Sequence, residues 1–347
     1  MMTVLHEAAK RGDIQAVKLI LIEQHGVDYI NLGDMTGTTA LHYAIRAESL
    51  EVTELLLIHG ANPNIQNLYG HTASYYAVNV KKRIEFIKLL LAHGANPNIQ
   101  DKYCSTPLHC AAHYCDIVTI KLLLKKGANL NVLDVTHSTP FADAYRMFMV
   151  DQETNKGVMQ LLVTEIVKLE HLGIKISGSD LEGVNLNKQL INESKQLKEL
   201  EQQCHKEIKK MKSICVSKND SSFFDIFVVQ KDINTLARCA NNPDIVKCKN
   251  RFLMYSSCIE KSIEEGKVRA KLLQGAVESI DEIFESNQDA SQKSQTSWLH
   301  LSQEVRLMIL ENLNNDDLTK LQHTDIAEAV AESEVEAGGA HAIYEGE

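Results

Sequence analysis

The sequence predicts an all-α fold, in which a solenoid of helical repeats precedes a C-terminal helical domain that ends in a helix pair. The string Gly-Ala-Asn-Pro-Asn-Ile occurs at Gly60–Ile65 and Gly94–Ile99, and a variant follows at Gly127–Val132, so that the spacings are 34 and 33 residues. A second motif keeps nearly the same period and begins at Thr3, Thr39, Thr72, Thr106 and Thr139. Self-similarity at a fixed period is typical of a repeat stack. Aromatic residues make up only 5% of the chain and Pro is scarce, which suits helices better than a β-sandwich or barrel.

Each repeat is expected to form two helices and a loop. In the first repeat, Ala8 and Ala9 are small enough for a neighbouring helix to approach, and Gly12 makes the turn because it accepts positive φ. Apolar residues then line the second helix. A Gly follows the second helix in three repeats and is expected to end it in the left-handed conformation: Gly60, Gly94 and Gly127.

Five such repeats are expected over residues 1–173. The fifth departs from the pattern, because 46 residues separate Gly127 from Gly173. We expect the polar stretch Asp151–Lys156 to be an insertion between its two helices. A degenerate repeat is typical of the end of a stack.

The period, the Thr-Pro-Leu-His openings and the Gly-Ala-Asn closings together resemble the ankyrin repeat. The resemblance implies a binding surface, and it implies that His6, His42 and His109 form hydrogen bonds between neighbouring loops. The fourth repeat also holds side chains of the types that bind zinc: Cys104, His109, Cys110, His113 and Cys115. Most of these positions face the stack in the repeat register, so neither a metal nor a cofactor is expected.

The tips of the loops occupy positions that the fold leaves free. The candidate target-binding residues there are Met35, Leu68, Tyr69, Lys102, Tyr103 and Val135. The resemblance implies that these tips and the inner helices form a concave site for a partner protein, an unknown host target in this case. Tyr69 and Tyr103 are candidate anchors, because aromatic side chains are enriched in binding hot spots. The alternative, that both only cap the neighbouring turn, stays open.

Residues 174–297 keep a helical periodicity after the repeats stop. One amphipathic helix is indicated by the apolar spacing of Leu197, Leu200, Cys204, Ile208, Met211 and Cys215. Four further helices are expected at Ser221–Val229, Asp232–Ala240, Ile245–Ile263 and Val268–Phe284. A polar linker, Glu285–Ser297, follows them.

Residues 298–323 are similar to the start of an F-box, whose pattern is roughly LPxEhxxxILxxLxxxDLxxL. The matching residues are Leu301, Glu304, Val305, Ile309, Leu310, Leu313, Asp317, Leu318 and Leu321. Ser302 stands where Pro is usual and is a candidate N-cap for a helix from Gln303 to about Asn312. A cluster of exposed apolar side chains marks a partner site, although these residues could instead pack on the preceding helices.

Ankyrin repeats, a helical spacer and a truncated F-box over roughly residues 197–321 together resemble the PRANC domain. That domain ends ankyrin proteins of poxviruses, and it also occurs in bacterial symbionts of insects and in parasitoid wasps. The resemblance implies a host-directed substrate adaptor. Its ankyrin repeats would bind a target protein, and its F-box-like end would dock on the Skp-family subunit of a cullin–RING ubiquitin ligase. The alternative is an ankyrin scaffold that sequesters a host protein by occupancy, without ligase recruitment.

Composition and motifs exclude several other classes of function. The formal net charge is −10, and residues 324–347 hold seven acids and no Lys or Arg, so we expect this tail to be disordered and expect no nucleic-acid partner. No apolar run is long enough to span a membrane. Signatures of phosphate-binding loops, serine hydrolases and zinc proteases are absent, so we expect a protein that is not an enzyme. We expect a monomer in the host-cell cytoplasm or nucleus.

Overall fold

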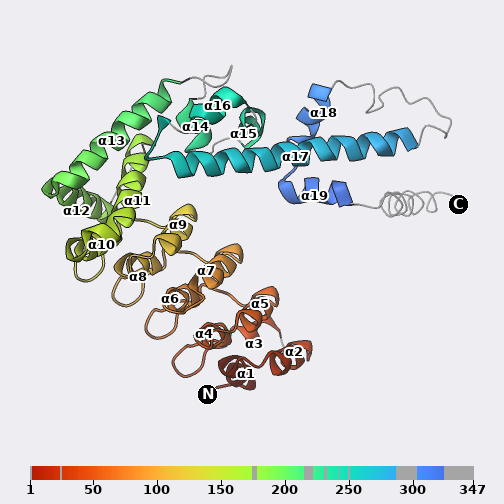
Figure 1. Cartoon of the computed structure of the whole chain (residues 1–347). Helices are drawn as coiled ribbons and strands as arrows, with labels where there is room; N and C mark the ends of the chain where they lie inside the picture. The colour runs from red at the N-terminus through yellow and green to blue at the C-terminus, as the bar shows by residue number, and fades with distance from the viewer. Residues whose placement is uncertain are drawn as a thin grey trace, which may run out of the picture. The chain divides into compact units, whose positions relative to one another are not determined.

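The computed structural model describes residues 2–23, 26–173, 178–214, 222–229, 233–240, 242–248, 251–286 and 303–323. Within these stretches the chain is helical and forms no β-strand, which confirms the predicted all-α class (Figure 1). The chain divides into two compact units, Met1–His205 and Lys206–Glu347.

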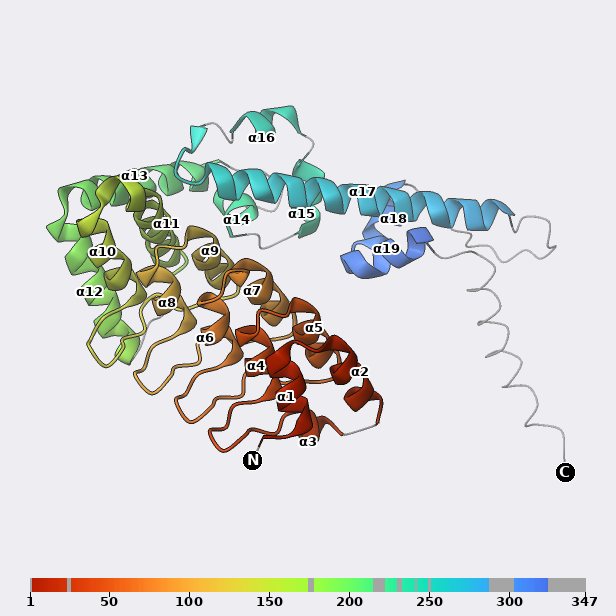
Figure 2. The same cartoon turned by 60° about the horizontal axis from the view of Figure 1, so that its bottom comes forward.

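The first unit is a stack of helix pairs, and the loops that join successive pairs lie side by side along one edge (Figure 2). Its helices are α1 (Val4–Arg11), α2 (Ile14–Ile22), α3 (Val27–Ile30), α4 (Ala40–Arg46), α5 (Leu50–Ile58), α6 (Ala73–Val78), α7 (Arg83–Ala92), α8 (Pro107–His113), α9 (Ile117–Lys125), α10 (Pro140–Val150), α11 (Gln152–His171) and α12 (Ser179–Glu193). The helix α13 (Lys195–Lys212) follows and continues into the second unit.

The Thr of the repeat motif begins the inner helix, and the His three residues later links one repeat to the next. In the second repeat, Nδ1 of His42 accepts a hydrogen bond from the amide of Thr39 (3.1 Å), and Nε2 of His42 donates to the carbonyl of His71 in the next repeat (3.2 Å). His6 and His109 make the equivalent bonds to the carbonyls of Leu32 (3.0 Å) and Ser138 (3.2 Å). The predicted structural role of the three histidines is therefore confirmed.

The Gly-Ala-Asn segments link the repeats at a second place. Gly60, Gly94 and Gly127 have φ between 80° and 94°, which confirms the predicted left-handed conformation. Asn64 then spans two repeats, because its side-chain amide donates to the carbonyl of Gly94 (3.0 Å) and its Oδ1 accepts from the amide of Asn96 (2.7 Å). Asn31 and Asn98 repeat this arrangement.

The helix α12 covers the last Gly-Ala-Asn segment. Its Asn187 is 1% exposed and donates to the carbonyl of Leu130 (3.3 Å) and to Oδ1 of Asn131 (3.1 Å). Gly183 allows this close packing, since a Cβ there would lie 1.9 Å from the carbonyl oxygen of Asn131. The bond from Asn187 to Oδ1 of Asn131 thus replaces the bond that Oδ1 of Asn64 accepts from the next repeat.

The fifth helix pair differs from the sequence prediction. Asp151–Lys156 is not an insertion, because Asp151 is the N-cap of α11 and accepts a hydrogen bond from the amide of Thr154 (3.1 Å). The extra residues lengthen the helices instead, so that α11 has 20 residues. A polar stretch that begins with Asp suits the first turn of a helix as well as it suits a loop.

The second unit is built on one long helix, α17 (Ser256–Ser286). Around it lie α14 (Phe223–Phe227), α15 (Ile233–Cys239), α16 (Pro243–Cys248), α18 (Gln303–Leu310) and α19 (Asn315–His323). The predicted break between Ile245–Ile263 and Val268–Phe284 was wrong because α17 runs through it, and the first of these predicted helices is divided between α16 and the start of α17. Gly266, near the expected break, is inside the helix and allows α15 to approach, since a Cβ there would lie 2.7 Å from the carbonyl oxygen of Leu236.

The apolar face predicted for α13 is confirmed within the described residues. Leu197, Cys204, Ile208 and Met211 are at most 1% exposed. Cys215, most of the linker and the tail after His323 lie outside the described residues, and so does Leu301 of the F-box-like motif.

Candidate protein-interaction surfaces

Each loop tip of the first unit is held by one acidic or amide side chain. Oδ1 of Asp34 accepts hydrogen bonds from the amides of Thr36 (2.7 Å) and Thr38 (3.0 Å). The equivalent residues of the next three tips accept the same pair of bonds: Asn67, Asp101 and Asp134. Short polar side chains readily accept hydrogen bonds from backbone amides two residues further along the chain, and these bonds stabilise the turn at each tip.

The first of these tips is also tied to its inner helix. The hydroxyl of Tyr43 on α4 donates to Oδ2 of Asp34 (2.7 Å). Burial acts to raise the pKa of Asp34, but hydrogen bonds from Thr36, Tyr43 and Thr38 outweigh it and hold the pKa well below its usual range. Burial and the same carboxylate raise the pKa of Tyr43 to about 12.

Backbone hydrogen bonds join consecutive tips. We name this set of hydrogen bonds the tip ladder. They run from the amide of Leu68 to the carbonyl of Thr36 (2.8 Å), from Lys102 to Tyr69 (3.1 Å) and from Val135 to Tyr103 (2.9 Å). The tips therefore form one continuous edge, in which the side chains of the ladder residues take no part in the bonding.

The six predicted target-binding residues lie on this edge and are exposed. The exposed fractions are 84% for Met35, 58% for Leu68, 56% for Tyr69, 64% for Tyr103 and 55% for Val135, and Lys102 is exposed as well. The ammonium of Lys102 lies 6.0 Å from the centre of the Tyr69 ring, within the range of a cation–π contact. The structure thus brings together the residues that the sequence had placed in separate loops.

The inner helices add aromatic residues that the sequence analysis did not name. The guanidinium of Arg46 lies 5.9 Å from the ring centre of Tyr43 and 5.7 Å from that of Tyr76. The rings of His71 and Tyr75 stack at 3.7 Å. The repeat period could have found Tyr43 and Tyr76, because both come four residues after the Thr of their repeats.

His109 and Cys110 of the fourth repeat have structural surroundings. Both ring nitrogens of His109 are engaged, with Thr106 and with Ser138. Burial raises the pKa of the Cys110 thiol to about 12, which disfavours the thiolate that a metal would need. In the part of the chain that the structure describes, no group of three His, Cys, Asp or Glu residues is arranged to hold a metal ion.

The F-box-like residues divide between the core of the second unit and its surface. Leu310 (2% exposed) and Leu318 (0%) belong to the hydrophobic core with Leu273 and Val277 of α17. Leu313 is half-buried against the same core. Ile309 is 48% exposed and is preceded by Met308 at 63%.

The other predicted residues of this group are placed less fully. Asp317 is half-buried, and Glu304 and Val305 lie on α18 and Leu321 on α19, where the structure describes their backbone only.

A buried guanidinium holds the turn between α18 and α19. Arg269 of α17 is 2% exposed, and it donates to the carbonyls of Glu311 (3.2 Å) and Leu313 (2.6 Å). It also donates to Oδ1 of Asn234 (3.1 Å) and Oδ1 of Asn315 (2.9 Å). These bonds satisfy carbonyls at the end of α18 that have no partner within the helix.

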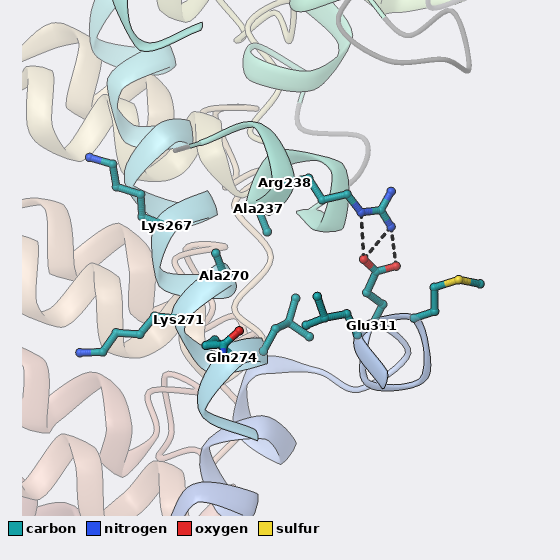
Figure 3. Close-up of a pocket in the computed structure, with 10 residues that line it drawn as sticks. Ala237, Arg238, Lys267, Ala270, Lys271, Gln274 and Glu311 are labelled. Atoms are coloured by element: carbon teal, nitrogen blue, oxygen red, sulfur yellow. Dashed lines mark hydrogen bonds and ion pairs between the residues drawn. The ribbon is translucent and has the colours of Figure 1, made fainter. Parts of the chain in front are cut away.

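A groove in the second unit runs between α15, α17 and α18 and has a volume of about 820 Å³. Its floor is apolar and consists of Ala237, Ala270, Leu273 and Leu307. Figure 3 shows the ion pair of Arg238 with Glu311 on one side of the groove and Lys267 and Lys271 on the other. We name it the α17 groove.

These two surfaces, an edge of exposed loop tips and a groove beside a helix pair, are the candidate sites for protein partners in the described part of the chain. A family model for ankyrin repeats matches residues 1–67, 47–134 and 74–168, and a model for the PRANC domain matches residues 218–323. The chain is similar to the ankyrin repeat protein FPV031 of Fowlpox virus, with 31% identity over 327 residues, which are 91% of this chain and 80% of that protein. The chain therefore belongs to the ankyrin repeat proteins, and it carries a PRANC domain.

Other viral relatives are covered less completely. The ankyrin repeat protein FPV024 of Fowlpox virus is 25% identical over 321 residues, which are 92% of this chain but 44% of that protein. The ankyrin repeat protein OPG189 of Monkeypox virus is 34% identical over 116 residues, which are 33% of this chain and 18% of that protein. None of the helices in the described stretches combines the length and the hydropathy that a membrane-spanning segment needs.

Proposed function

We propose that the protein is a substrate adaptor that acts in a host cell. Its loop tips bind a target protein, and the helix pair α18–α19 docks on the Skp-family subunit of a cullin–RING ubiquitin ligase. The observation that carries this proposal is that the exposed tip edge and the F-box-like helix pair belong to different compact units. Such a division suits a molecule that holds two partners at once.

The geometry narrows the proposed ligase contact. Leu310 and Leu318 are buried in the unit's own core, so they shape the helix pair but are not free to contact a partner. The exposed apolar side chains of α18 are Met308 and Ile309. A few such side chains can carry most of the energy of an interface, and we propose that these two do so here.

The second candidate function is a scaffold that sequesters a host protein by occupancy. The observation that favours it is the burial of Leu310 and Leu318, since a helix pair whose main apolar residues face inward can be purely structural. Under this alternative the tip edge would bind its target in the same way, and the second unit would recruit nothing.

A titration of the full chain with a purified Skp-family protein separates the two functions. We expect Ile309→Asp to weaken binding at least tenfold, because an unpaired carboxylate in an apolar interface costs several kcal/mol. Leu253→Asp is the matched control, since Leu253 is 72% exposed in the same unit. Absence of binding by the unmodified chain at about 100 µM, where a millimolar complex would begin to form, would leave the occupancy scaffold as the better account.

The place of action and the oligomeric state form part of the same proposal. The relatives are viral, which supports action inside a host cell, and we propose the cytoplasm or the nucleus as the compartment. We further propose that the protein acts as a monomer that carries one target and one ligase subunit.

A further inference from the structure

We propose that the α17 groove is a docking site for an acidic amphipathic helix of a partner protein. This inference rests on the proposed role of the second unit in recruiting a partner, but it does not depend on which protein is recruited. Three features of the groove carry it: its volume, its floor and the charges along its sides.

The groove is large enough for several side chains and has a floor suited to apolar ones. Its volume of about 820 Å³ lies within the range of roughly 300–1,000 Å³ that is usual for binding pockets. Ala237 and Ala270 deepen it because their side chains are short, and Leu273 and Leu307 complete the apolar surface. Met308 at the edge is 63% exposed and would gain burial from an occupant.

The charges along the groove favour an acidic occupant. Its lining holds three cations, Arg238, Lys267 and Lys271, and the single acid Glu311. Glu311 is already paired with Arg238 (2.5 Å). Lys267 lies 2.9 Å from Glu264, but that pair is exposed and therefore worth little.

Lys271 is the cation that remains available for an occupant. It is exposed, and it has no ion-pair partner among the described residues of the chain. A chain with a net charge of −10 therefore presents a locally positive groove. Opposite charges of this kind guide association and fix the register of a complex.

The geometry also points to a helix as the occupant. Lys267 and Lys271 are one turn apart on α17, so they form a positive row at the outer rim of the groove, and their side chains extend away from Ala237 and Ala270 (Figure 3). A helix that lays an apolar stripe on this floor can place acidic residues along its own flank opposite that row.

The test uses two synthetic helical peptides of about 18 residues, long enough to form helix. Both carry the same Leu stripe, and one is flanked by Glu and the other by Lys. We expect the full chain to bind the Glu peptide at least tenfold more tightly in a fluorescence anisotropy titration, with an affinity that falls as salt is added. The double variant Lys267→Glu with Lys271→Glu should reverse the preference, and Met308→Glu should weaken binding of the Glu peptide.

The matched control is Lys206→Glu with Lys209→Glu, which changes the net charge equally on the exposed face of α13. The proposal would be overturned if the control lost as much affinity for the Glu peptide as the groove double variant does. It would also be overturned if the unmodified chain did not bind the Glu peptide at about 100 µM. The proposal would also be overturned if the Glu peptide bound only to a chain that ends at His323. That result would mean that the acidic residues 324–347 of the chain itself occupy the groove. A chain that binds the Glu peptide but no Skp-family protein would keep the groove and refute the ligase adaptor.

Discussion

Two of the histidines between the repeats, His42 and His109, are single residues on which the stability of the stack depends in a pH-sensitive way. Burial lowers the pKa of His42 from 6.5 to about 4, and burial also lowers the pKa of His109. In each case Nδ1 must accept a hydrogen bond from the amide of the Thr that begins the helix, and a protonated ring cannot accept it. The folded state therefore favours the neutral ring.

We predict that the stack loses stability as the pH falls from about 6.5 towards 4. The unfolded chain binds more protons than the folded chain in this window, so the contribution of His42 is complete above about pH 6.5 and is lost near its folded pKa. Its size is about 3 kcal/mol, at 1.36 kcal/mol for each pKa unit. Urea unfolding at several pH values gives the free energy of unfolding as a function of pH. Between pH 4 and 6.5 this free energy should change less steeply with pH for His42→Gln than for the unmodified chain. An equally small slope for the exposed-site variant His93→Gln would contradict this assignment.

A second residue-scale prediction concerns the fourth position of each loop tip, where φ is positive. Gly70 has φ of 77°, and a Cβ there would lie 2.7 Å from the amide nitrogen of Lys102. We expect Gly70→Ala to lower the free energy of unfolding by about 1–3 kcal/mol, the usual cost of such strain. The equivalent Cys104 already has φ of 58°. Cys104→Gly should therefore be neutral or stabilising in thermal unfolding, and a loss as large as that of Gly70→Ala would refute the argument.

At the scale of elements, α18 has one face in the core and one in solvent, and the two faces should respond differently to mutation. We predict that Leu310→Ala destabilises the second unit by about 2–5 kcal/mol, as truncation of a fully buried Leu does. Met308→Ala on the same helix should change the free energy of unfolding by less than about 0.5 kcal/mol, because its side chain is 63% exposed. Chemical denaturation of both variants checks this assignment. Similar losses in the free energy of unfolding would contradict the assignment of Leu310 to the core and Met308 to the surface.

The elements also show how far the sequence alone could lead. The repeats were predictable because the same local signals recur: Thr at the helix start, Gly in the left-handed conformation after the second helix, and His between loops. The second unit has no period to check one element against another. Its Gly266 was compatible with a helix end, and the close approach of Leu236 on α15, which a Gly at this position allows, involves a residue distant in sequence.

The candidate sites were predictable to a similar extent. The tip residues could be named because the repeat register fixes which loop positions are free. The F-box-like residues could be named but not divided into core and surface, since the partner of Leu310 and Leu318 is a helix some forty residues earlier in the chain. The α17 groove is formed by three helices and has no signature in any one of them.

At the scale of the whole molecule, we predict that target binding and ligase binding are separable. Tyr69→Ala with Tyr103→Ala should weaken binding of the target and leave Skp-family binding within about twofold, because the two surfaces belong to different units. Ile309→Asp should weaken Skp-family binding and leave target binding unchanged. Pull-downs with both partners measure this, and the loss of both activities in a folded variant would show that the two ends act as one composite site.

The tip ladder has a consequence for how such a protein can change over time. Its hydrogen bonds use only backbone amides and carbonyls, so the side chains of Leu68, Lys102 and Val135 can be exchanged without loss of the bonds that hold the tips. Most of the constraint on sequence falls on Asp34 and its equivalents, which the target need not touch. If the tips select the target as proposed, a lineage can acquire new target proteins by substitutions in one loop at a time. Each substitution would change the free energy of unfolding only slightly. Diversification of specificity is thus separated from conservation of the scaffold.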